Sequence, residues 1–305
     1  MPDLLTPEFM HRLDRLDVAS RKLLRGSMQG ERRSKQKGQS VEFADYRPYV
    51  VGDDLRRIDW NLYARLDKLF LRLFLEEQDL SVTVLFDTTR SMDWPQNTAT
   101  QPSKLLYAKQ LAAALGYVAL NQHNRLSVFA FADRLLGQLD GLRGKRSLPR
   151  LLQFLEDTPV SESPGDLSAS LRQLALTQRR PGVVVVISDF LDKSAALSES
   201  LRFLAGPKFD ALAVQVLSPE ERDPAKASGG GIAGDLRLTD VEDGDVAEVS
   251  ATSVLVGKYR ETLRAYIESV RQSCVRRGVG FADVSTDLPV ERLVLDTFRQ
   301  RGWLK

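Results

Sequence analysis

The chain has 305 residues, of which 43% are hydrophobic and 28% charged, and its formal net charge is +2. These values are ordinary for a globular protein with a substantial core, and they exclude a chain that is basic throughout, as many nucleic-acid-binding proteins are. The single cysteine, Cys274, rules out an internal disulfide. We expect no nucleic-acid partner, no signal peptide, no transmembrane segment and a cytoplasmic location, because no apolar stretch is long enough to cross a bilayer.

Residues 1–79 are predicted to form a first unit. It opens with a short amphipathic helix that has Phe9, Leu13 and Leu16 on one face. A basic stretch follows within residues 12–37, and we expect it to be solvated, because the aromatic side chains that stack on nucleic-acid bases are missing beside it. The alternation of apolar and polar residues from Phe70 to Phe74 indicates a strand, so this unit contains a small β structure.

Residues 80–305 are predicted to form a second unit, in which strands and helices alternate. Apolar runs predict strands over 81–86, 125–132, 182–188, 210–217 and 278–285, with 133–139 returning antiparallel. Helical periodicity covers 103–122, 146–156, 166–177, 195–205 and 254–276, with a closing helix in 288–301 and a hairpin insertion near 218–250. This order predicts an α/β fold with a mostly parallel sheet and helices on both faces. On the stripe of the 254–276 helix, Cys274 is expected to be a core residue.

Two of the predicted strands end in a carboxylate. Asp87 follows "VTVLF" and Asp189 follows "VVVIS". Ligands of parallel sheets bind beyond the carboxyl ends of the strands, so the two side chains would converge if the strands are neighbours. Thr89 and Ser91 add hydroxyls, and such an oxygen-only set suits Mg²⁺ or Mn²⁺. The alternative is that these residues only form turns and cap helices, as Asp, Thr and Ser commonly do.

The stretch "LFDTTRSM" resembles the strand-end loop of the metal-ion-dependent adhesion site in von Willebrand factor A-type domains. Further stretches, "VEFADYRPYVVGDDLRRIDWNLYAR", "GDLSASL", "VVVVISDF" and "YRETLRAY…GVGFADVSTD", resemble one bacterial family over roughly residues 20–300. This is the domain-of-unknown-function family fifty-eight, whose von Willebrand A-like members are typically encoded beside MoxR-type AAA+ ATPases. The resemblance implies a von Willebrand A-like, Rossmann-like sheet and a partner ATPase.

The same resemblance assigns a metal site for Mg²⁺ or Mn²⁺ with the candidate ligands Asp87, Thr89, Ser91 and Asp189. The family commonly has Gly-Thr-Asp-Leu in a second loop, where this chain has "SPGDLSASL". Gly165 stands at the threonine position and has no hydroxyl. Asp166 is a further candidate ligand, and its alternative role is to cap the following helix.

A second polar cluster lies in "YRPYVVGDDLRRIDW" and comprises Asp53, Asp54, Arg56, Arg57, Asp59 and Trp60. It would serve either as a docking surface for the ATPase or as a salt-bridged turn in which Trp60 anchors a core.

These observations favour a non-enzymatic protein-interaction module. It would act as an adaptor of a MoxR-type ATPase in the assembly or maturation of an unidentified client protein, with a bound Mg²⁺ accepting a carboxylate from the partner. The alternative is a Mg²⁺-dependent phosphoryl-transfer hydrolase with Asp87 as the nucleophile. Such hydrolases place a second Asp two positions further on, where this chain has Thr89, and the chain has no phosphate-binding Gly-x-x-x-x-Gly-Lys-Ser/Thr loop.

Overall fold

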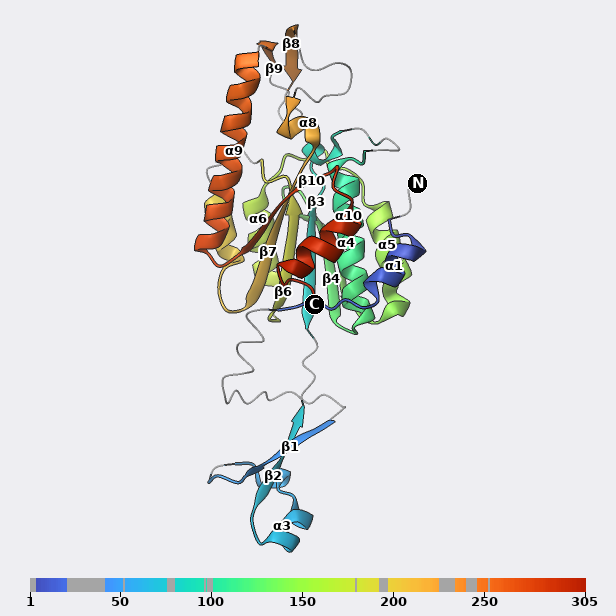
Figure 1. Ribbon diagram of the computed structural model, residues 1–305, viewed down its shortest axis with the longest axis vertical. Helices are drawn as coiled ribbons and strands as arrows, with labels where there is room; N and C mark the ends of the chain where they lie inside the picture. The colour runs from blue at the N-terminus through green and yellow to red at the C-terminus, as the bar shows by residue number, and fades with distance from the viewer. Residues whose placement is uncertain are drawn as a thin grey trace. The chain divides into compact units, whose positions relative to one another are not determined.

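The computed structural model describes residues 4–20, 42–51, 53–75, 80–95, 97, 101–178, 180–191, 197–224, 234–239, 246–251 and 253–305. The chain divides into two compact units (Figure 1). The larger unit comprises Met1–Gln29 with Leu80–Lys305, and the smaller unit comprises Gly30–Asp79. In the part of the chain that is described, no helix is both long and apolar enough to span a bilayer.

The larger unit is built on a six-stranded sheet with the order β10-β7-β6-β3-β4-β5. The strands are β3 (Ser81–Asp87), β4 (Arg125–Phe131), β5 (Leu135–Leu142), β6 (Gly182–Ser188), β7 (Phe209–Leu217) and β10 (Gly280–Ser285). All neighbours are parallel except β5, which returns antiparallel along β4 at the sheet edge. Every residue of β3 and β6 is buried, as expected for strands covered on both faces.

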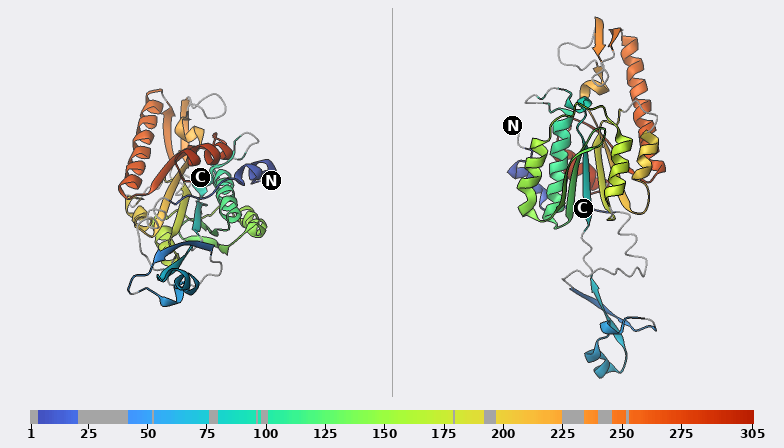
Figure 2. Two further views of the ribbon diagram at one scale, coloured as in Figure 1. Left: turned by 60° about the horizontal axis from the view of Figure 1, so that its bottom comes forward. Right: turned by 180° about the vertical axis from the view of Figure 1, so that it is seen from behind.

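Helices cover both faces of this sheet (Figure 2). Because side chains alternate along a strand, Val84 and Phe86 of β3 face one apolar cluster and Leu85 faces the other. The first cluster includes residues of α1 (Pro7–Leu13), α4 (Lys104–Asn121), α5 (Leu148–Asp157), α10 (Val290–Arg292) and the π-helical turn η6 (Leu293–Phe298). The second includes residues of α6 (Leu167–Thr177), α7 (Leu197–Ser200), the 3₁₀ turn η4 (Leu201–Phe203) and α9 (Ser253–Arg276). The fold is therefore the predicted mixed α/β architecture, with a mostly parallel sheet and helices on both faces.

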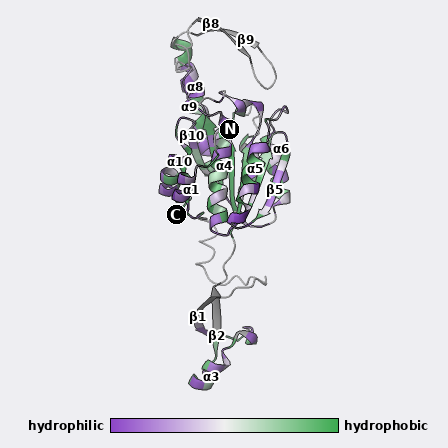
Figure 3. Cartoon of the chain, turned by 90° about the vertical axis from the view of Figure 1, so that its right-hand side faces the viewer, coloured by the Kyte–Doolittle hydropathy of each residue, from purple (hydrophilic) through white to green (hydrophobic). Residues whose placement is uncertain are grey.

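Hydropathy follows this arrangement. Hydrophobic residues gather on the sheet, and most hydrophilic residues lie on the helices and loops around it (Figure 3). Cys274 is fully buried in the second cluster, which confirms its prediction as a core residue. Burial also raises the pKa of its thiol to about 12, so this cysteine is an inert packing group.

The N-terminal helix α1 packs on the larger unit, whereas the predicted boundary at residue 79 grouped it with the small one. Phe9 and Leu13 lie on the helix as predicted, whereas Leu16 follows its end at Leu13, and all three are buried in the cluster that includes α4. Tyr117 of α4 donates a hydrogen bond to Asp14 over 2.7 Å. The helix therefore completes the core of the larger unit. Most of the basic stretch 12–37, namely residues 21–37, lies outside the described residues.

The insertion after β7 begins with the short helix α8 (Pro219–Arg222) and contains an antiparallel hairpin of β8 (Gly234–Thr239) and β9 (Val246–Ala251). This confirms the predicted hairpin, and its turn lies outside the described residues. Two further 3₁₀ turns, η2 (Arg90–Asp93) and η3 (Lys145–Ser147), follow β3 and β5.

The small unit has two antiparallel strands, β1 (Glu42–Pro48) and β2 (Phe70–Leu75), joined through the 3₁₀ turn η1 (Leu55–Arg57) and the helix α3 (Trp60–Leu66). The predicted strand over 70–74 is β2. Ile58 and Leu71 are both buried and form an isolated β-bridge, which ties the connecting segment to the hairpin.

Candidate functional site at the carboxyl ends of the strands

The two strand-end carboxylates meet at one edge of the sheet. Strands β3 and β6 are parallel neighbours, and Phe86 is paired with Ile187, so Asp87 lies beside Ser188 and Asp189 follows directly. The Ser188 hydroxyl donates a hydrogen bond to Asp87 Oδ2 over 2.7 Å. The predicted convergence of Asp87 and Asp189 is therefore present.

Asp87 is held from within the chain. Its side chain is buried, and its second oxygen, Oδ1, accepts a 2.9 Å hydrogen bond from the backbone N–H of Thr89. Burial, and then the neighbouring charge of Asp189, raise the pKa of Asp87 to about 6. Both oxygens are therefore engaged, and the carboxylate is less ionised than an exposed one, so this geometry adds no support to the nucleophile assigned in the hydrolase alternative.

A buried lysine, Lys104, completes this edge of the sheet, and the sequence analysis did not identify it. Its side chain is 0% exposed, and its Nζ donates to Asp189 Oδ2 over 2.8 Å and to Oε1 of Glu221. Burial acts to lower the pKa of Lys104, and the two carboxylates outweigh it and raise that pKa. Burial acts in turn to raise the pKa of Asp189, and Lys104 lowers it below its usual value. Lys104 and Asp189 thus form a charged, buried ion pair.

Glu221 is positioned beside this pair by the local hydrogen bonds of α8. Ser218 caps α8 and forms a capping box with Glu221, in which each side chain accepts a hydrogen bond from the other residue's backbone N–H. Tyr259 of α9 donates to the Glu221 carbonyl over 2.7 Å. Glu221 is the second functional residue that the sequence analysis missed. The available signal was Lys104 itself, a cation in the first turn of a largely apolar helix, where the helix dipole disfavours positive charge.

The hydroxyls of Thr89 and Ser91 lie 3.0 Å apart and share a hydrogen bond. Ser91 also lies near Asp189 and helps to lower the pKa of that carboxyl, after the larger effect of Lys104. Gly165 adjoins this pair, since a Cβ on Gly165 would lie 3.1 Å from the Thr89 methyl carbon Cγ2. Gly165, at the position where the family commonly has threonine, therefore supplies no hydroxyl to this edge of the sheet.

Asp166 caps α6. Its Oδ1 accepts a 2.8 Å hydrogen bond from the backbone N–H of Ala169, which is the capping role stated as the alternative in the sequence analysis. Its assignment as a metal ligand stays a prediction.

The described residues do not fit a divalent cation as they are arranged. Asp189 already has the Lys104 ammonium as its positive partner, and Gly165 offers no oxygen. Among the described residues, no group of three or more His, Cys, Asp or Glu side chains is placed to hold a metal ion. An O-ligand site for Mg²⁺ needs about six oxygens in near-octahedral order, and here one of the candidate oxygens, Asp189 Oδ2, is bonded to an ammonium.

Comparison with known proteins places the chain in a family. Residues 45–275 match the family model described as "Protein of unknown function DUF58". The chain belongs to the DUF58 family. It is 26% identical over 287 residues to the uncharacterized protein Rv1480 of Mycobacterium tuberculosis (strain H37Rv), covering 93% of this chain and 87% of that one. The uncharacterized protein Mb1516 of Mycobacterium bovis matches to the same extent.

Two solved structures have partial similarity to this DUF58 chain. BatB from Bacteroides thetaiotaomicron aligns over 72% of this chain and 98% of its own, with 15% identity and a TM-score of 0.46. The SpRpn10 VWA domain aligns over 71% of this chain and 94% of its own, with 13% identity and a TM-score of 0.36.

The charged cluster in the small unit of this DUF58 chain forms local contacts. Asp59 caps α3 by accepting hydrogen bonds from the backbone N–H groups of Asn61 and Leu62, and Tyr46 donates to its other oxygen over 3.0 Å. Asp54 caps η1, the turn that contains Arg56 and Arg57, and Asp53 pairs with Arg47 over 2.7 Å.

Trp60 has a different position from the one given in the core-anchor interpretation. Its side chain is 60% exposed and packs edge-on against Tyr63. Trp60 begins α3, and its exposure leaves an aromatic surface on the small unit. The docking role of this cluster stays a prediction.

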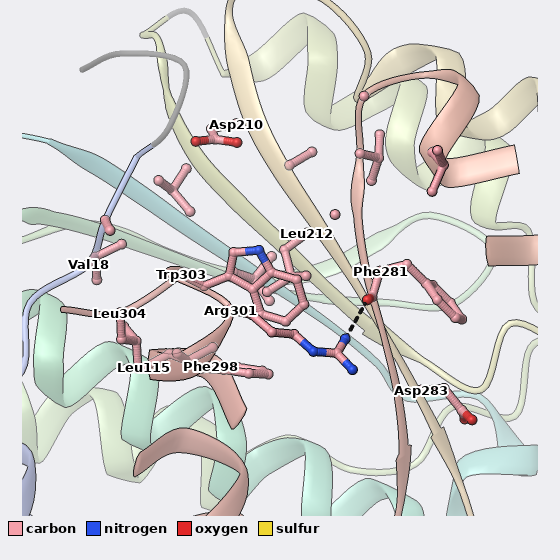
Figure 4. Close-up of a pocket in the computed structure, with 18 of the residues that line it drawn as sticks. Val18, Leu115, Asp210, Leu212, Phe281, Asp283, Phe298, Arg301, Trp303 and Leu304 are labelled. Atoms are coloured by element: carbon pink, nitrogen blue, oxygen red, sulfur yellow. Dashed lines mark hydrogen bonds between the residues drawn. The ribbon is translucent and has the colours of Figure 1, made fainter. Parts of the chain in front are cut away.

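A cavity of about 920 Å³ lies at the opposite, amino end of the sheet (Figure 4). It is lined by residues near the starts of β6, β7 and β10, together with Arg301 and Trp303 near the C-terminus. Arg301 donates to the Phe281 carbonyl over 3.0 Å and lies over the Trp303 ring, and Asp210 accepts from Ser20 over 3.1 Å. These contacts hold the N-terminal segment and the C-terminal residues on the sheet.

Proposed function

We propose that this DUF58 chain is a non-catalytic interaction module that docks on a MoxR-type AAA+ ATPase. It would use the carboxyl-end face of its sheet and present an unidentified client protein to the ATPase. The von Willebrand A-like fold supports the general part of this proposal, since such folds are commonly protein-interaction modules. The identity of the ATPase rests on the family resemblance in the sequence.

The observation on which the proposal depends is that both carboxylates at the sheet edge already have partners within the chain. Asp87 accepts hydrogen bonds from Ser188 and Thr89, and Asp189 forms an ion pair with Lys104. Groups with these internal partners are poor candidates for proton transfer or nucleophilic attack, both of which need a reactive atom within reach of a substrate. The hydrogen bonds and the ion pair fix these side chains in place, and this supports a binding role in preference to a catalytic one.

Exposed groups surround this buried network and form the proposed docking surface. Trp94 is 50% exposed, and its carbonyl accepts a 3.1 Å hydrogen bond from the backbone N–H of Lys104, so it lies directly beside the network. Arg90 and Glu162 form an exposed ion pair at 3.3 Å. An exposed tryptophan with a nearby arginine is the composition found at the centre of many protein interfaces.

The Mg²⁺-bridged form of docking stays a prediction from the resemblance. The Lys104 ion pairs support the simpler form, in which the partner contacts Trp94 and Arg90 directly.

Binding of the full chain to a purified MoxR-type ATPase tests the proposal. We expect Trp94→Ala to weaken binding by about 10-fold or more, as loss of an interface tryptophan commonly does. The matched comparison is Trp60→Ala, which removes a similarly exposed tryptophan from the small unit. This proposal expects it to leave the affinity unchanged, whereas the prediction that the cluster containing Trp60 docks expects a loss. The reverse pattern would move docking to the small unit, and absence of binding by the wild type would reject the ATPase as the partner.

A further inference from the structure

We infer that the ammonium of Lys104 permanently occupies the cation position of the strand-end site, so that this DUF58 chain is a metal-independent variant of a von Willebrand A-like module. In this arrangement Glu221, from the same chain, fills the place of the carboxylate that a partner would present to a bound metal. The inference concerns the chain alone and does not depend on which protein it binds.

The first argument is the position of Lys104 Nζ. This atom lies 2.8 Å from Asp189 Oδ2 and within hydrogen-bond reach of Glu221 Oε1, so one unit of positive charge lies between two carboxylates. A divalent ion bonded to Asp189 would approach this atom to within a few ångströms, and two like charges at that distance in a dry site repel each other strongly. The ammonium and the metal are therefore alternatives.

The burial of Lys104 carries the second step. Its side chain is 0% exposed, whereas lysine side chains are almost never fully buried unless they are paired. It also occupies the first turn of α4, where the helix dipole opposes a cation. These costs persist only if the two carboxylates offset them, so Lys104 is a fixed component of the site and does not swing out to admit a metal.

The loop that contains Gly165 carries the third step, which is independent of Lys104. Gly165 has no side chain, and the atom that a Cβ there would meet is the Thr89 methyl carbon at 3.1 Å. The loop therefore supplies no hydroxyl where the family commonly has threonine, and the ligand set has one oxygen fewer. The missing hydroxyl weakens a divalent cation site, and the ammonium of Lys104 excludes the ion from it.

The geometry of Glu221 carries the fourth step. In cation-mediated adhesion, the partner supplies a carboxylate to the open position of the metal. Here Glu221 supplies one from α8, held by its capping box with Ser218. The carboxylate position is thus satisfied within the chain, and a partner finds a closed surface with no vacant ligand position.

A titration of the full chain with Mn²⁺ tests this inference. The electron paramagnetic resonance signal of the free ion measures how much Mn²⁺ is bound. The wild type is expected to bind no Mn²⁺ at this site. Lys104→Ala leaves Asp189 and Glu221 facing a vacated position, and we expect its affinity for Mn²⁺ to exceed that of the wild type by at least about 10-fold. The same titration should raise the melting temperature of the variant and leave that of the wild type unchanged.

Matched controls define the outcomes. Lys145→Ala removes a lysine from an exposed pair with Asp14 and should gain no Mn²⁺ binding. Mn²⁺ binding by the wild type that is lost in Asp189→Asn would overturn the inference, and so would a folded Lys104→Ala that gains none. If Lys104→Ala does not fold, Lys104→Gln replaces it, and the wild-type titration alone still decides whether the site accepts a metal.

Discussion

The carboxylates of the two units reach their partners over very different distances along the chain. In the small unit, Asp53, Asp54 and Asp59 accept backbone hydrogen bonds from residues no more than three positions away. In the larger unit, Asp189 is paired with Lys104 across 85 positions, and Lys104 with Glu221 across 117. The first set shapes turns and helix ends, and the second set exists only when the whole sheet has formed.

Because of this difference, substitution of a charged residue should cost different amounts of folding free energy in the two units. An exposed capping carboxylate contributes a modest local stabilisation. A buried ion pair involves a large desolvation cost that only its partner offsets, so removing one member leaves an uncompensated charge. Substitutions at the strand-end site should therefore affect the entire larger unit, whereas substitutions in the small unit should act locally.

The largest expected effect comes from Lys104→Ala in the absence of metal. The variant leaves Asp189 and Glu221 buried without their cation, and we expect the free energy of unfolding to fall by about 3–5 kcal/mol. Urea denaturation of the full chain measures it. Lys145→Ala, from an exposed pair, is the control and should change stability by no more than about 1 kcal/mol. Equal effects of the two substitutions would erase the distinction between the buried and exposed pairs.

The next effect is a pH dependence at Asp87. Its pKa in the folded chain is raised from 3.8 to about 6, so the stability contributed by its protonated form is fully present below pH 3.8 and is lost as the pH rises through 6. Asp87→Asn removes this titration. We expect the stability of the variant relative to the wild type to increase between pH 4 and pH 7 by up to about 3 kcal/mol.

Thermal unfolding at a series of pH values measures this difference. Asp166→Asn is the control, because asparagine also caps helices and Asp166 is exposed. A relative stability of Asp87→Asn that stays flat from pH 4 to pH 7 would contradict the raised pKa.

The smallest effect is expected in the small unit. Asp59→Ala removes the cap of α3 and the acceptor of the Tyr46 hydroxyl, and should cost about 1–2 kcal/mol. The loss should appear as faster hydrogen exchange at the amides of Asn61 and Leu62 in the full chain. Asp54→Ala, which removes a more exposed cap from a three-residue turn, serves as the comparison and should cost less. The exchange rates of the strand amides in the larger unit should be the same in both variants as in the wild type. A change in those rates would show that the effect is not local.

Local patterns in the sequence predicted the elements well where one kind of interaction determined them. The β-branched run "GVVVVIS" predicted β6 with its observed bounds, because only a strand covered on both faces accommodates such a sequence. The capping role of Asp166, stated as the alternative to a metal ligand, is a local one, because its partner Ala169 lies three positions away. The convergence of Asp87 and Asp189 followed from the general rule that parallel strands end at one edge.

Features that depend on distant packing were not predicted. The sequence does not indicate that Lys104 lies next to Asp189, since their contact requires β3, β6 and α4 to be assembled. The N-terminal helix was grouped with the small unit because only its burial against α4 reveals where it belongs. Trp60 was considered as a core anchor because its type suggests burial, and its 60% exposure depends on the orientation of α3.

The most direct test of the Lys104 assignment is a crystal structure of the wild-type full chain grown with a high concentration of Mn²⁺, with anomalous scattering recorded from the manganese. The account predicts no anomalous peak within bonding distance of Asp87 or Asp189, and a Lys104 ammonium hydrogen-bonded to Asp189 and Glu221. A manganese peak bonded to Asp189, with the Lys104 side chain displaced, would contradict it.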